Sequence, residues 1–137
     1  MTPTTNELLV GNFMALAVPP PPESMGEFLS GRVSVVGLIS LLAAQEAENG
    51  VAVRVWENGT IADLLAKAGA AVPRAADPSD LSIAALDAHN AALRRLLIGV
   101  HEVAELEGKV ALDREILSLY QAMADRRMLV LPPLPGA

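Results

Sequence analysis

The sequence lacks cysteine and contains few aromatic residues. Its 137 residues include no Cys, and aromatic side chains make up only 3% of them. Without cysteine, the chain has no disulfides, thiolate metal ligands or cysteine nucleophiles. The first dozen residues also contain no Lys or Arg, and therefore lack the charged start of a signal peptide. We therefore expect a cytoplasmic protein.

Basic charge is also scarce. Ten Lys and Arg residues stand against sixteen Asp and Glu residues, which gives an acidic chain with a formal net charge of -6. Proteins that bind nucleic acid without sequence specificity need a basic surface to neutralise phosphates, and many that bind single strands stack bases on aromatic rings. We therefore predict that the chain has no nucleic-acid partner.

The third absence is a long uninterrupted hydrophobic run. Mean hydropathy is high at +0.38, but the most apolar stretch, residues 33–44, is interrupted by two serines and a glycine. A membrane-spanning helix needs about 20 apolar residues. We therefore expect no membrane partner, and the length predicts a single helical domain over residues 1–137.

Helix signals begin at the N-terminus. Thr4 and Glu7 have the spacing of a capping box, which predicts a helix that starts there. The four prolines at 19–22 end this helix, because proline lacks the backbone N–H that a helix interior needs. Consecutive prolines favour the extended polyproline II conformation. Residues 19–22 are therefore predicted to form a proline-rich linker.

A second capping box, Ser24 with Glu27, predicts another helix over about 28–48, with Asn49-Gly50 as its end. Gly31 and Gly37 lie inside this helix. Because glycine costs a helix interior about 1 kcal/mol relative to alanine, we interpret both positions as sites of close helix packing.

Residues 51–56 allow two interpretations. Their valines alternate with other residues between two Asn-Gly pairs, which is typical of a short strand. However, the sequence offers no convincing partner strand, and a lone strand leaves its backbone groups unpaired. We favour helix or irregular structure, and an α+β fold is the alternative.

The C-terminal half shows three further helix signals. Thr60 predicts a short helix over 61–68 that ends at Gly69, and a linker follows over 70–76. Asp77 and Pro78 predict the start of a long helix that reaches residue 107, and a last helix is expected over 113–127. The fold class is therefore predicted to be all-α, a bundle of four to five helices with at most one short strand.

The apolar tail at residues 128–137 is predicted to be extended. It contains a Pro-x-x-Pro spacing that aromatic grooves recognise, so a protein partner is one interpretation. Packing of the tail over the core of its own or a neighbouring chain explains the same residues.

The long helix expected over 78–107 contains an apolar stripe with heptad spacing and an asparagine at an a position, a device that can fix oligomeric state. This stripe is the candidate dimer or helix-packing interface; its residues are Ile83, Leu86, Asn90, Leu93, Leu97 and Val100. Packing inside a bundle and pairing with a second copy both fit the stripe. The helix would measure about 45 Å, longer than the diameter of about 37 Å of a compact domain this size, which favours a homodimer.

Few residues are candidates for catalysis or for metal binding. His101 and Glu105 lie one helical turn apart, but a zinc-protease motif would need a second histidine at position 105. We therefore predict no metal and no other cofactor, and these two residues are the weak candidates for a metal. Arg54 beside Trp56, together with Tyr120, is the candidate pocket, although Trp56 is explained more simply as a core residue.

Two functions remain open from the sequence. The favoured hypothesis is a non-enzymatic protein-interaction or accessory module that acts as a homo-oligomer. The alternative is a binder of a small apolar ligand, or an enzyme, with a pocket between its helices. The absence of nucleotide-binding loops and of a nucleophile elbow favours the first hypothesis.

Overall fold

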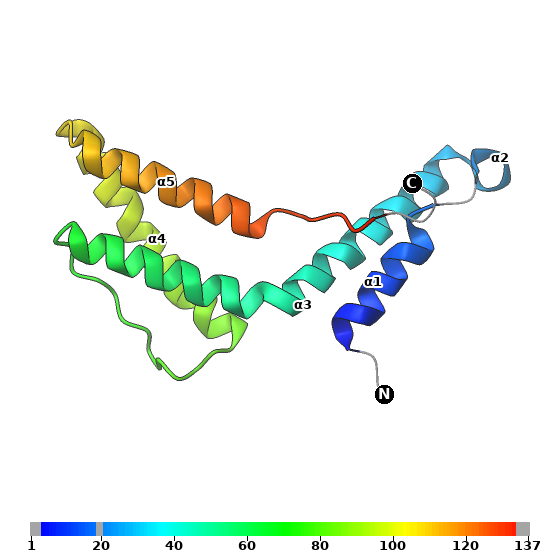
Figure 1. The fold of residues 1–137 in the computed structure, drawn as a ribbon, viewed down its shortest axis with the longest axis horizontal. Helices are drawn as coiled ribbons and strands as arrows, with labels where there is room; N and C mark the ends of the chain where they lie inside the picture. Colours follow the sequence, from blue (N-terminus) through cyan, green and yellow to red (C-terminus); the bar gives the residue numbers. More distant parts are fainter. Residues whose placement is uncertain (1–3, 19–20, 134–137) are drawn as a thin grey trace. The chain divides into compact units, whose positions relative to one another are not determined.

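The computed structural model describes residues 4–18 and 21–133 (Figure 1). Within these ranges the chain forms five helices and no strand, which confirms the prediction of an all-α fold. Residues 51–56 are helical, so the α+β alternative is wrong for the described residues. The helices are α1 (Thr5–Leu16), α2 (Pro22–Met25), α3 (Glu27–Lys67), α4 (Ile83–Leu106) and α5 (Val110–Arg127).

The start of α1 confirms the predicted capping box. The Thr4 side-chain oxygen accepts a hydrogen bond from the Glu7 backbone N–H (3.2 Å), and the Thr4 N–H donates to Glu7 Oε2 (2.7 Å). The proline linker needs correction, because Pro22 is the first residue of α2. Proline is tolerated there since the first helical N–H has no partner within the helix. Pro19 and Pro20 lie outside the described residues.

Helix α3 overturns three predicted helix boundaries. It runs without a break through Asn49-Gly50, and Ser24 does not cap it, because the Ser24 hydroxyl donates to the Pro21 carbonyl (2.8 Å). Thr60 does not start a new helix either. Its hydroxyl donates one turn back to the Trp56 carbonyl (2.9 Å), a bond that a serine or threonine makes inside a helix.

The predicted end of α3 at Gly69 is correct. Gly69 has φ 78°, its N–H donates to the Ala66 carbonyl, and the Ala70 N–H donates to the Leu65 carbonyl, both at 3.0 Å. These two bonds form a Schellman motif, which favours glycine because its backbone adopts the left-handed conformation without strain. The segment that follows, residues 70–82, contains no helix.

Helix α4 starts later than predicted. Its N-cap is Ser82, whose hydroxyl accepts from the Ala85 N–H (3.2 Å). The Asp77 carboxylate instead accepts from the Ser79 N–H (2.8 Å), which forms a local turn before the helix. The 24 residues of α4 measure about 36 Å, so the length argument for a homodimer does not hold.

The chain divides into two compact units, and the prediction of a single domain stays a prediction. Unit 1 comprises Met1–Asn49 and Leu129–Ala137. Within it, α1 lies along the first part of α3, where the Asn12 amide donates to the Ser40 hydroxyl (2.5 Å). Residues 128–133 of the predicted extended tail contain no helix, and the Gln45 amide donates to the Val130 carbonyl (2.9 Å). Residues 134–137 lie outside the description.

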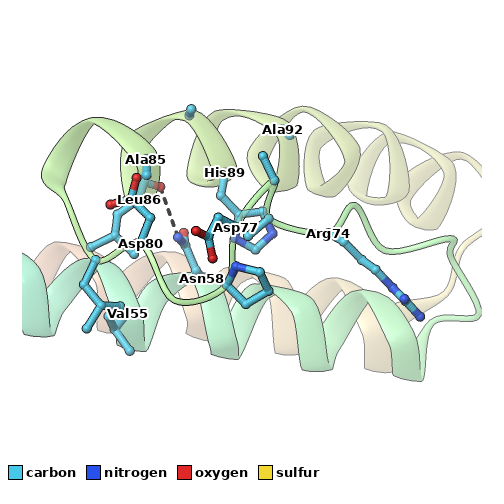
Figure 2. Close-up of a pocket in the computed structure, with 14 residues that line it drawn as sticks. Val55, Asn58, Arg74, Asp77, Asp80, Ala85, Leu86, His89 and Ala92 are labelled. Atoms are coloured by element: carbon cyan, nitrogen blue, oxygen red, sulfur yellow. Dashed lines mark hydrogen bonds between the residues drawn. The ribbon is translucent and has the colours of Figure 1, made fainter.

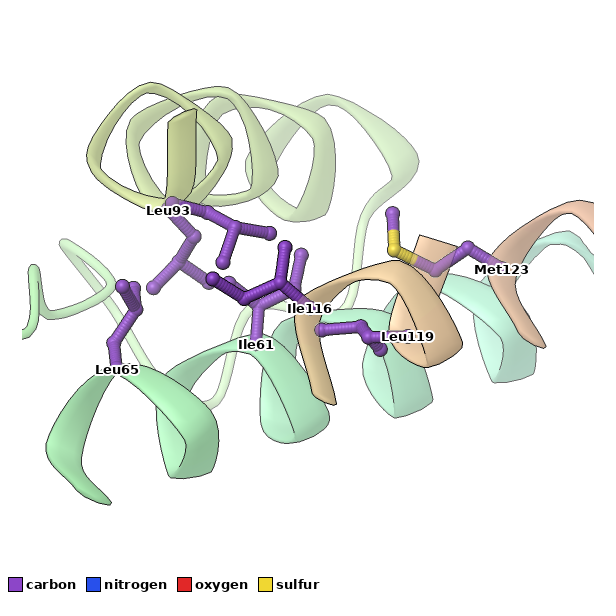
Figure 3. Close-up of a cluster of buried hydrophobic side chains, with 7 residues drawn as sticks. Ile61, Leu65, Leu93, Ile116, Leu119 and Met123 are labelled. Carbon is purple, nitrogen blue, oxygen red and sulfur yellow. The ribbon is translucent and has the colours of Figure 1, made fainter. Parts of the chain in front are cut away.

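Unit 2, Gly50–Met128, is a three-helix bundle of the second part of α3 with α4 and α5. Gly108, at φ 65°, ends α4 and allows the chain to reverse into α5. Figure 3 shows buried side chains from all three helices converging on one hydrophobic core. The core residues are Ile61, Leu65, Leu93, Leu97, Ile116, Leu119 and Met123.

Candidate functional site

The predicted interface stripe of α4 lies largely inside unit 2. Its four central residues are buried: Leu86, Asn90, Leu93 and Leu97. Val100 is half-buried and packs against the same core, whereas Ile83 is 41% exposed. The stripe therefore serves helix packing within the chain, and its buried side chains are not available to a second copy.

Asn90 belongs to a buried polar network centred on Glu57. The Glu57 carboxylate has no exposed surface, and Arg127 donates to both of its oxygens, at 2.7 and 2.9 Å. Arg94 donates from 3.4 Å and the Asn90 amide from 3.3 Å. The Asn90 amide also donates to the Asn58 side-chain oxygen (2.8 Å). The network satisfies a charge that would otherwise be too costly to bury.

Electrostatics keep Glu57 ionised. Burial by itself raises the pKa of this carboxyl, but the hydrogen bonds and positive charges of Arg127 and Arg94 outweigh burial and hold the pKa below its ordinary value. The sequence analysis did not predict that Glu57 is buried. The signal was present, because Glu57 lies four and eight positions before Ile61 and Leu65 and therefore on the same face of α3.

The three candidate pocket residues each have a structural partner. The Arg54 Nε donates to Asp87 Oδ1 (2.6 Å), and the Arg126 guanidinium lies 4.0 Å from the centre of the Trp56 ring. Tyr120 packs its ring edge-to-face against another aromatic ring, and both Trp56 and Tyr120 pack against the core of unit 2. These contacts give the three residues roles in packing and ion pairing.

A cavity of about 480 Å³ lies elsewhere in unit 2, between the segment 74–81, α3 and α4 (Figure 2). Most of its lining is alanine, leucine and proline. Its polar groups largely bond to the chain itself: the Asn58 amide donates to the Leu86 carbonyl (3.1 Å), and His89 Nε2 lies 3.0 Å from the Pro73 carbonyl oxygen. Few polar groups therefore remain to orient a ligand.

The two metal candidates come together with a third residue. His101 Nε2 lies 3.8 Å from Glu105 Oε1 and 3.0 Å from Asp113 Oδ1. The ligand atoms of all three side chains lie within 4.8 Å of one another. Sequence reasoning missed Asp113, although the predicted break at 107–108 between two helices was a signal that the ends of these helices would meet.

The largest set of exposed apolar side chains lies on the first part of α3, in unit 1. We name this set the α3 apolar face: Phe28, Leu29, Val35, Val36, Leu38, Ile39 and Leu42. Each side chain is at least 41% exposed, and Phe28 reaches 75%. Several of these residues line a shallow groove with Gly31 and Arg32, and the Arg32 guanidinium lies 5.6 Å from the centre of the Phe28 ring.

Helix α1 covers the opposite side of α3 within unit 1. A Cβ built on Gly37 would lie 3.3 Å from Leu16 Cβ, which confirms close packing at this glycine. The Asn6 amide donates to the Ala44 carbonyl (3.1 Å) on the same side. A Cβ on Gly31 would meet nothing within 4 Å, so the prediction of close packing is wrong for that position within the described chain.

Helix α3 is the one helix in the described part of the chain that is long and apolar enough, by length and composition, to cross a membrane.

Comparisons of the chain with protein-family models, curated proteins and solved structures give no match. The function is therefore inferred from the chain's own residues.

Proposed function

We propose that the protein is a non-enzymatic interaction module that forms a homodimer through the α3 apolar face. The observation that carries the proposal is this exposed apolar surface on the side of α3 opposite α1. Contiguous exposed apolar patches with a polar rim commonly mark interaction surfaces, because their burial removes apolar area from water.

Two charges of opposite sign support an antiparallel second copy as the occupant. Arg32 lies within the face, after Phe28 and Leu29. Glu46 lies beyond the C-terminal end of the face, and Ile39 lies midway between these two charges. A two-fold axis beside Ile39 places Arg32 of each copy opposite Glu46 of the other. A parallel pairing would place like charges together. Flanking charges set orientation in this way at helix–helix interfaces.

The length of the uncharged run supports a protein occupant over a lipid bilayer. Although α3 is long and apolar enough by composition to cross a membrane, its charge-free stretch covers only residues 33–45. A spanning segment of about 20 residues would therefore place Arg32 or Glu46 in the hydrocarbon core. Glu48 adds a second carboxylate two positions after Glu46. A helix–helix contact can leave such charges at its rim.

The decisive experiment is the mass of the full chain in solution by sedimentation equilibrium. We expect a dimer for the wild type. For Ile39→Asp we expect the dimer dissociation constant to be at least about 100-fold higher, because a charge buried at the centre of the contact loses its hydration. The matched control is Leu117→Asp on α5, which replaces an aliphatic side chain of similar exposure outside the face and should keep the wild-type mass.

Charge exchange tests the orientation. Arg32→Glu and Glu46→Arg should each weaken the dimer, and the double variant should restore it, because the ion pairs re-form with reversed sign. A monomeric wild type at all concentrations would contradict the proposal. So would an Ile39-dependent association with phosphatidylcholine vesicles in the absence of a dimer, which would identify lipid as the occupant.

The small-ligand alternative depends on the cavity beside segment 74–81. Its apolar lining suits an aliphatic group, and Arg74 at its edge could pair with a carboxylate. A rise in the melting temperature with short fatty acids, lost in Arg74→Ala, would favour this alternative.

A further inference from the structure

The turn at Gly108 brings acidic and imidazole side chains from two helices together. The Gly108 N–H donates to the Glu105 carbonyl (3.2 Å) and the Lys109 N–H to the Ala104 carbonyl (2.8 Å), which closes α4 in a Schellman motif. The reversal that follows sets the first turn of α5 beside the last turns of α4. His101 and Glu105 therefore meet Asp113.

We propose that His101, Glu105 and Asp113 form a binding site for a divalent transition-metal ion of the zinc type. Zinc binds one imidazole nitrogen and carboxylate oxygens at about 2.0–2.2 Å. In a tetrahedral site such ligands lie about 3.4 Å from one another. The observed separations of 3.0 and 3.8 Å from His101 Nε2 bracket this value.

The charges at the cluster favour a cation. Within the described residues, the Glu105 and Asp113 carboxylates both lie within ion-pairing distance of the His101 imidazole, and neither pairs with a lysine or an arginine. The nearest lysine in sequence, Lys109, pairs with Glu107 instead (2.6 Å). Two carboxylates without a lysine or arginine partner leave negative charge that a divalent ion neutralises.

The cluster combines a held imidazole with accessible carboxylates. The His101 side chain is only 17% exposed, and the Tyr120 ring packs edge-to-face against it with centroids 5.5 Å apart. The Glu105 side chain is 64% exposed, which leaves an entry path for the ion. An imidazole held by packing loses little freedom when it binds a metal.

Zinc titration of the full chain by isothermal calorimetry tests the site. We expect one Zn²⁺ per chain. Asp113→Asn should weaken zinc affinity at least about tenfold, since even outer-shell partners of metal ligands contribute about 10- to 100-fold. The matched control is His89→Gln, which removes the other histidine outside the cluster and should leave the affinity unchanged. No zinc binding, or equal affinity in wild type and in the folded double variant His101→Gln with Asp113→Asn, would overturn the proposal.

Discussion

Glu57 shows at the residue scale how a buried charge organises packing. Its carboxylate receives hydrogen bonds from residues on α4 and from Arg127 at the end of α5. Arg127 lies in the last turn of α5, where its positive charge also interacts favourably with the negative end of the helix dipole. The neutral Asn90 contributes to the same network. Of the two interpretations that the sequence left open for this residue, pairing with a second copy and packing inside a bundle, its buried contacts fit packing between helices of one chain.

Replacement of Glu57 by Gln should lower the free energy of unfolding by about 3 kcal/mol, because it leaves Arg127 and Arg94 without their anionic partner. Urea unfolding measures this change. The control Glu48→Gln removes an exposed carboxylate and should stay within about 0.5 kcal/mol of wild type.

Glu57→Gln should also change how the free energy of unfolding depends on pH. Because the pKa of Glu57 is lower in the folded chain than in the unfolded one, its contribution is fully present above the unfolded-state pKa and is lost as the pH falls through the folded-state pKa. Glu57→Gln should therefore lose less stability on acidification. An unchanged acid slope would contradict this assignment.

Glycines have opposite roles at the scale of the helix. Gly69 ends α3 with φ 78°, whereas Gly59 lies inside α3 with the φ of an ordinary helix and nothing within 4 Å of a Cβ built on it. Neither Asn-Gly pair, at 49–50 or at 58–59, therefore ends the helix. Surrounding contacts, such as the buried Asn58, override the local preference for a break.

Replacing each of these two glycines by alanine should change the stability of the chain in opposite directions. Gly59→Ala should stabilise the chain by about 0.5–1 kcal/mol, because alanine loses less backbone entropy in a helix. Gly69→Ala should destabilise it by about 1–2 kcal/mol, because a side chain strains the left-handed conformation. Thermal unfolding of both variants measures the difference. If both variants shifted the melting temperature in the same direction, the position of each glycine in the helix would not explain its effect on stability.

At the scale of the whole molecule, the two units differ in how they are stabilised. Unit 2 has the seven-residue core and the Glu57 network. In unit 1 the buried hydrophobic residues of the described chain are Phe13, Leu41 and Ala44. A unit with less buried apolar surface opens at a lower free energy.

Hydrogen exchange should reveal this difference. We expect the amides of α1 to exchange at least about tenfold faster than those at the centre of α4, because less buried area protects them. Mass spectrometry of peptides from the exchanged full chain measures both rates. Equal protection in the two units would instead support the single cooperative domain that the length predicts.

Local chemistry along the chain is enough to predict several features of this protein. The Thr4 capping box, the glycine end of α3, the break at 107–108 and the all-α class follow from hydrogen bonds and backbone preferences within a few residues. Other features follow from contacts between helices. The continuity of α3, the burial of Glu57 and the meeting of His101 with Asp113 depend on which helix faces another, and these contacts join residues far apart along the chain.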